Sequence, residues 1–138
     1  MMNPLNHLEV GVPRILVIDD EAQMRYMLRE MLEDAGYEVL DAARSDDGVE
    51  TFRRTPVDLV ITDLFMPPKG GLEVIRELQS DDPKVKIIAI SGMGVQDRVD
   101  LDILAKQSGA VRAFRKPFGR EELLGAIREL IGGSDTAS

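Results

Sequence analysis

Three features of the sequence predict an α/β protein built on a doubly wound, five-stranded parallel sheet. Short apolar runs alternate with longer amphipathic segments along the 138 residues, in five successive strand-then-helix repeats. The runs lack polar alternation, as expected for parallel strands covered by helices on both faces. Right-handed crossovers between successive strands then give an open sheet with helices on either side.

The first two repeats occupy the N-terminal part of the chain. An apolar run at residues 14–18 predicts the first strand, and the helix after it ends at Gly36. A second strand is expected at residues 37–40, and Ser45 is the expected cap of the second helix. The apolar positions at helical spacing are Met24, Met27, Leu28, Met31 and Leu32, then Val49 and Phe52. The methionines of the first helix are expected to fill the core.

The last three repeats follow the same pattern. Strands are expected at residues 58–62, 86–90 and 113–115, and helices at 72–78, within 96–107, and at 123–131. Gly132 and Gly133 end the last helix. The expected organisation is a leader (1–12), one domain (13–131) and a flexible tail (132–138).

Composition excludes several function classes. The formal net charge of -8 argues against general nucleic-acid binding, which requires a basic surface. Cysteine is absent, so disulfides and thiolate chemistry are excluded, and the only histidine, His7, lies in the leader. Neither a signal peptide nor an apolar stretch long enough to cross a bilayer is found, so we expect a cytoplasmic protein without membrane contact.

Polar side chains follow four of the five predicted strands. Asp19 and Asp20 come after the first strand, Asp63 after the third, Ser91 after the fourth and Lys116 after the fifth. The carboxyl ends of parallel strands share one edge of the sheet, where open α/β sheets bind ligands. An isolated aspartate at a strand end is usually a helix cap or a loop residue. A compatible group at four strand ends points instead to one common site.

The chemistry of this set suits phosphoryl transfer. Three neighbouring carboxylates repel one another, and a hard divalent cation such as Mg²⁺ relieves that repulsion. Lys116 adds a positive charge, and the hydroxyl of Ser91 can donate a hydrogen bond to a phosphoryl oxygen. A carboxylate beside a metal ion and a lysine is equipped to attack phosphorus and form an acyl phosphate.

The sequence resembles the response regulator receiver family of two-component signalling systems. Ile15–Asp20 resembles its first strand and paired acids, and Asp58–Pro67 followed by Gly70–Gly71 resembles its phosphoacceptor segment. Ser91–Gly92 and Lys116–Phe118 resemble its hydroxyl and Lys-Pro-Phe motifs. The resemblance implies a flavodoxin-like (βα)5 fold, similar to single-domain chemotaxis regulators.

The resemblance also implies a role for each site residue. Asp63 would be the phosphoacceptor, and Ser91 and Lys116 would bind the phosphoryl oxygens. The implied ligands of Mg²⁺, or of Mn²⁺ in its place, are the side chains of Asp19, Asp20 and Asp63 and the backbone carbonyl of Phe65. Asp19 would act largely through a bound water.

The implied partners are proteins. A sensor histidine kinase or a His phosphotransfer protein would donate the phosphoryl group, and a downstream protein would receive the signal by docking or phosphorelay. The chain would act as a monomer or weak dimer. It would not be an enzyme beyond its own phosphorylation and dephosphorylation.

One position departs from the family pattern. Ala113 stands three residues before Lys116, where the family often has a Tyr or Phe whose rotation transmits phosphorylation. Phe114 is adjacent, but neighbouring strand residues point to opposite faces, so it cannot substitute. The usual aromatic relay is therefore not expected.

Two other functions compete with this interpretation. The chain could be the N-terminal receiver of a longer regulator whose output domain follows Ser138. Less readily, it could be a small Mg²⁺-dependent phosphohydrolase that uses Asp63 as its nucleophile.

Overall fold

The central element is a five-stranded parallel sheet in the order β2-β1-β3-β4-β5. The computed structural model describes residues 11–64, 70–92, 109–110 and 112–132. The strands are β1 (Arg14–Ile18), β2 (Glu38–Ala42), β3 (Leu59–Asp63), β4 (Ile87–Ser91) and β5 (Arg112–Arg115). From β1 the chain moves outward to β2 and then returns to β3 on the other side. The predicted doubly wound fold is confirmed, with its switch point between β1 and β3.

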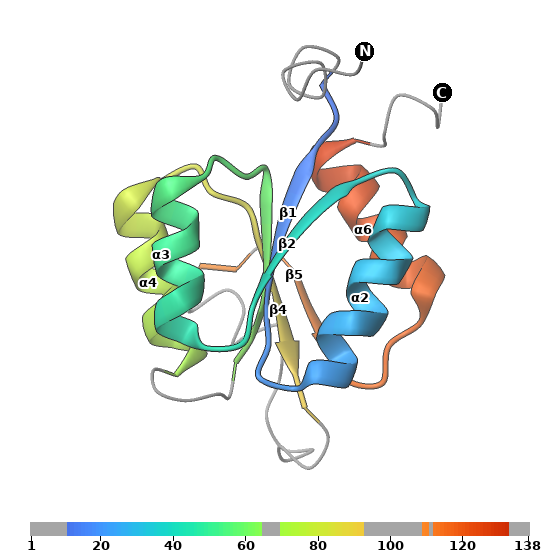
Figure 1. The fold of residues 1–138 in the computed structure, drawn as a ribbon, viewed down its shortest axis with the longest axis horizontal. Helices are drawn as coiled ribbons and strands as arrows, with labels where there is room; N and C mark the ends of the chain where they lie inside the picture. The colour runs from blue at the N-terminus through green and yellow to red at the C-terminus, as the bar shows by residue number, and fades with distance from the viewer. Residues whose placement is uncertain (1–10, 65–69, 93–108, 111, 133–138) are drawn as a thin grey trace.

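Helices cover both faces of this sheet (Figure 1). They are α2 (Ala22–Asp34), α3 (Ser45–Arg54), α4 (Gly71–Asp81) and α6 (Arg120–Ile131). Figure 1 shows α2 and α6 on one face and α3 and α4 on the other. The helix predicted within residues 96–107 lies outside the described residues. No helix in the described part of the chain is long and apolar enough to cross a membrane.

Successive side chains along each strand point alternately into two apolar cores, one on each face of the sheet. Ile15 and Val17 belong to the core beneath α2 and α6, whereas Leu16 and Ile18 belong to the core beneath α3 and α4. All four are fully buried. Burial on both faces explains why the strands read as continuous apolar runs, and it fixes the sheet as a rigid platform for the residues at its edge.

Some details of the predicted elements differ from the structure. Met27 is 41% exposed, so it does not fill the core, which α2 reaches instead through Leu28, Met31 and Leu32. Ser45 is the first residue of α3 and Arg44 holds the cap position, so the predicted cap is wrong by one residue. The third and fourth strands extend one residue further than predicted, so Asp63 and Ser91 are their last residues. A last strand residue is held more firmly than a loop residue, because the sheet fixes its backbone.

Candidate functional site

Four of the predicted site residues converge at the carboxyl edge of the sheet. Asp19 directly follows β1, and Asp63 and Ser91 end β3 and β4. The backbone N–H of Lys116 donates to the carbonyl of Ser91 (2.8 Å), which fixes the end of β5 beside β4. All four side chains are buried. The structure therefore brings together residues that are up to 97 positions apart in the sequence.

The Lys116 ammonium is at the centre of this cluster. Its Nζ donates to Asp19 Oδ2 (2.9 Å), to Glu21 Oε1 (2.8 Å) and to Asp63 Oδ2 (3.2 Å). Burial disfavours the charged ammonium, but the hydrogen bonds to Glu21 and Asp19 and the nearby acidic charges outweigh it and raise the pKa of Lys116. Lys116 is therefore a fixed positive charge beside the predicted phosphoacceptor.

Glu21 is a site residue that sequence reasoning did not identify. It directly follows the paired acids and holds the N-cap position of α2, where a polar residue is ordinary. Its side chain makes no capping hydrogen bond and turns to Lys116 instead. The only sequence signal for this role is a third acid adjoining Asp19 and Asp20, which does not reveal that the end of β5 lies opposite.

Backbone contacts hold Asp19 in place. The N–H of Glu21 donates to Asp19 Oδ1 (2.9 Å), and Arg25 Nη1 donates to the Asp19 carbonyl (2.9 Å). Burial raises the pKa of the Asp19 carboxyl, opposed by the hydrogen bonds from the Glu21 N–H and Lys116 and reinforced by the charge of Asp63. The charge of Asp63 therefore works against ionisation of Asp19, and a cation bound at this cluster would relieve that repulsion.

The acidic cluster has the composition of a hard-cation site. One carboxylate oxygen from each of Asp19, Asp20 and Asp63 lies within 4.8 Å of the others. Asp20 is exposed and the other two are buried, so the cluster opens to solvent on one side. Carboxylate oxygens in this arrangement fit Mg²⁺, which keeps several of its waters. The predicted ligand carbonyl of Phe65 lies outside the described residues.

Ser91 carries an unusual polar atom. Its Oγ is buried, and no hydrogen-bond partner for it is found in the described part of the chain. A buried hydroxyl without a partner costs about 1–3 kcal/mol, which a protein usually avoids. This atom at the end of β4, next to β3, is suited to donate to a group placed on Asp63.

The structure confirms that Ala113 and Phe114 face opposite sides of β5. Ala113 packs against the core beneath α3 and α4, and Phe114 against the core beneath α2 and α6. The ring centroids of Phe114 and Phe118 lie 6.3 Å apart, and the Arg112 guanidinium lies 5.9 Å from the centroid of the Phe114 ring. Phe114 therefore packs on the opposite face of the sheet from Ala113, which holds the position of the usual aromatic relay.

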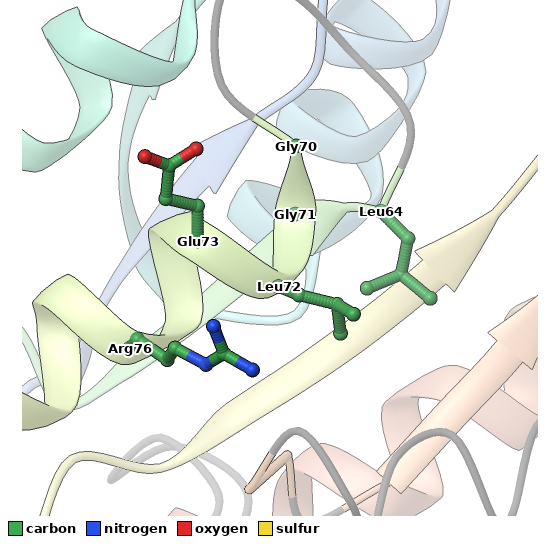
Figure 2. Close-up of a pocket in the computed structure, with 6 residues that line it drawn as sticks. All are labelled: Leu64, Gly70, Gly71, Leu72, Glu73 and Arg76. Carbon is green, nitrogen blue, oxygen red and sulfur yellow. The ribbon is translucent and has the colours of Figure 1, made fainter.

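A hollow of about 440 Å³ opens beside the N-terminus of α4 (Figure 2). It is lined by Leu64, Gly70, Gly71, Leu72, Glu73 and Arg76. Of the predicted site residues that the structure describes, none lines it. Figure 2 shows Gly71 at the start of the helix close to Leu64, the residue after Asp63. The hollow therefore marks where α4 meets the strand that carries Asp63.

Comparisons with known proteins agree with the geometry. Residues 15–128 match the response regulator receiver domain. The chain is 36% identical over 118 residues to the chemotaxis protein CheY of Thermotoga maritima, covering 85% of this chain and 96% of that protein. A solved receiver domain protein from Clostridium thermocellum is similar with a TM-score of 0.78 at 37% identity, covering 87% and 94%. Response regulator TrrA from Thermotoga maritima, solved in complex with Mg²⁺ and BeF, is similar with a TM-score of 0.74 at 34% identity, covering 86% and 99%.

Proposed function

The chain belongs to the response regulator receiver family of two-component systems, and we propose on this basis that Asp63 accepts a phosphoryl group from a phosphohistidine donor. The observation that carries the proposal is the position of Lys116, whose Nζ bridges Asp19 and Asp63 at the carboxyl edge of the sheet. The donor would be a histidine kinase or a His phosphotransfer protein. The phosphorylated chain would then signal to another protein.

The proposed reaction is a single displacement at phosphorus. A carboxylate oxygen of Asp63 forms a bond to phosphorus while the bond from phosphorus to the donor nitrogen breaks, and the imidazole keeps the electron pair. Lys116 stabilises negative charge on one phosphoryl oxygen, and Ser91 Oγ donates to another. Mg²⁺, held by Asp19, Asp20 and Asp63, would neutralise charge on the transferring group.

The test is incubation with the small phosphodonor phosphoramidate and Mg²⁺, followed by intact-mass and peptide mass spectrometry. A receiver gives one slowly decaying phosphoryl adduct per chain, located on Asp63. A phosphohydrolase would instead turn over an excess of varied phosphate esters without retaining an adduct. Sustained turnover of that kind would exclude the proposal.

Magnesium binding is expected to depend on Asp20. Because Asp20 is exposed, Asp20→Asn removes a ligand charge at little cost in folding, and we expect about tenfold weaker Mg²⁺ binding or more. Isothermal titration calorimetry of the unphosphorylated protein measures this directly. Glu30→Ala, which removes an exposed acid from α2 outside the cluster, is the matched control. Equal affinities in the two variants would rule out the proposed metal site.

Ser91→Ala is expected to separate stability from phosphoryl binding. Removing a buried hydroxyl without a partner should leave the free energy of unfolding unchanged or raise it by about 1 kcal/mol. The same change should weaken binding of beryllofluoride, a phosphoryl mimic, by about tenfold because one donor is lost. Urea denaturation and beryllofluoride titration measure the two effects, with Ser80→Ala on the exposed side of α4 as control. A large loss of stability would show that the hydroxyl has a structural role instead.

A further inference from the structure

The hydrogen-bonding capacity of Lys116 is fully used in this structure. An ammonium has three N–H donors and no acceptor. Here the three acceptors are carboxylate oxygens of Asp19, Glu21 and Asp63, at 2.9, 2.8 and 3.2 Å. A phosphoryl oxygen on Asp63 can therefore bind Lys116 only if one of these contacts is given up.

Glu21 is the partner that is released at the lowest cost. Its side chain is 62% exposed, whereas those of Asp19 and Asp63 are 1% and 6% exposed. A carboxylate that leaves Lys116 from an exposed position is rehydrated at once, but a buried one would lose its partner without gaining water. Release needs only side-chain rotation, because the Glu21 backbone is fixed by its N–H bond to Asp19 and by its carbonyl, which accepts from the Arg25 N–H.

From these contacts we propose that Glu21 competes with the phosphoryl group for Lys116 and thereby slows phosphorylation of Asp63. In the unphosphorylated protein the Glu21 carboxylate occupies the third donor of Lys116. When the phosphoryl group arrives, one of its oxygens takes that donor and Glu21 turns to solvent. Glu21 is thus a positioning residue that sets the balance between the two states. This inference rests on the proposed function of Asp63.

Two substitutions separate direct contact from general charge repulsion. Glu21→Ala removes both the charge and the contact. Glu21→Asp keeps the charge but is one methylene shorter, so its carboxylate is expected to fall short of Lys116. Neither change should harm the fold, because Glu21 makes no side-chain capping bond and aspartate is a favoured N-cap residue. Glu30→Ala removes one exposed acid from the same helix and serves as the control for net charge.

The experiment measures two quantities at saturating Mg²⁺. One is the rate of Asp63 labelling by phosphoramidate, and the other is the affinity for beryllofluoride. Both Glu21 variants should be labelled faster and bind beryllofluoride more tightly than wild type, by about threefold to tenfold, the range expected for a charge-assisted hydrogen bond with one exposed partner. Glu30→Ala should match wild type.

Three results would overturn the inference. Rates and affinities of Glu21→Ala equal to or below those of wild type would show that Glu21 does not compete. Acceleration in Glu21→Ala but not in Glu21→Asp would assign the effect to charge alone. An equal effect in Glu30→Ala would do the same. Failure of the proposed function looks different, because wild type and every variant would then stay unlabelled at Asp63. The beryllofluoride affinities alone would then show whether Glu21 competes for Lys116.

Discussion

Asp63→Asn is expected to abolish phosphoryl labelling of the chain. The substitution replaces the nucleophilic carboxylate by an amide of nearly the same shape, which cannot form the acyl phosphate. Neither phosphoramidate nor a phosphorylated histidine kinase should then leave an adduct, and intact-mass spectrometry should show only the unmodified chain. Phosphotransfer from each histidine kinase of the source organism would at the same time identify the cognate donor of the wild type.

The fold should survive this substitution, so loss of labelling will report chemistry. Asp63→Asn weakens the hydrogen bond from Lys116, because a neutral amide oxygen replaces a charged carboxylate, but it also removes a charge that opposes ionisation of Asp19. These effects have opposite signs, and we expect the free energy of unfolding to change by no more than about 1 kcal/mol. Asp34→Asn, at the exposed end of α2, is the matched control and should be labelled normally. Stoichiometric labelling of Asp63→Asn would place the phosphoacceptor elsewhere.

Much of the site was predictable because a parallel sheet aligns its strand ends. Once residues 14–18 and 58–62 are predicted to be parallel strands of one sheet, Asp19 and Asp63 must lie at the same edge of that sheet. The same reasoning placed Ser91 and Lys116, and the structure brings all four together. No knowledge of side-chain conformation was needed, because the topology alone determines which strand ends meet.

Contacts that depend on side-chain geometry could not be predicted in this way. The bond between Glu21 and Lys116 joins residues 95 positions apart and requires the start of α2 to face the end of β5. Met27 has the spacing of a core residue, but the stripe that α2 buries is narrower and centres on Leu28 and Leu32. The boundaries of β3 and β4 differ from the predicted ones by one residue, because hydrogen bonding to neighbouring strands, not composition, decides where each strand ends.

Gly71→Ala is expected to cause a large loss of stability. A Cβ atom on Gly71 would lie 2.4 Å from Leu64 Cα and 2.8 Å from the Leu64 carbonyl carbon and oxygen. These are backbone atoms, so no rotamer change can relieve the overlap, and the Gly71 N–H also donates to that carbonyl (2.8 Å). Overpacking against backbone should lower the free energy of unfolding by about 2–4 kcal/mol. Urea denaturation followed by far-UV circular dichroism measures it.

The neighbouring glycine is a matched control, since Gly70→Ala adds the same methyl group one residue earlier. Among the described residues nothing lies within 4 Å of a Cβ there, and the backbone has a φ of -68° that alanine adopts readily. The only expected cost is that of a weaker N-cap, about 1 kcal/mol or less. If both variants were equally stable, α4 would not be held against the end of β3.

The damage from Gly71→Ala should also reach the site. Leu64 directly follows Asp63, and its N–H donates to the carbonyl of Ile90 (2.8 Å), one residue before Ser91. A methyl group that pushes Leu64 away from α4 therefore displaces the ends of β3 and β4 together. Chains of Gly71→Ala that remain folded should bind Mg²⁺ more weakly and be labelled more slowly than Gly70→Ala. The close approach at Gly71 thus fixes the position of the acceptor carboxylate as well as the packing of the helix.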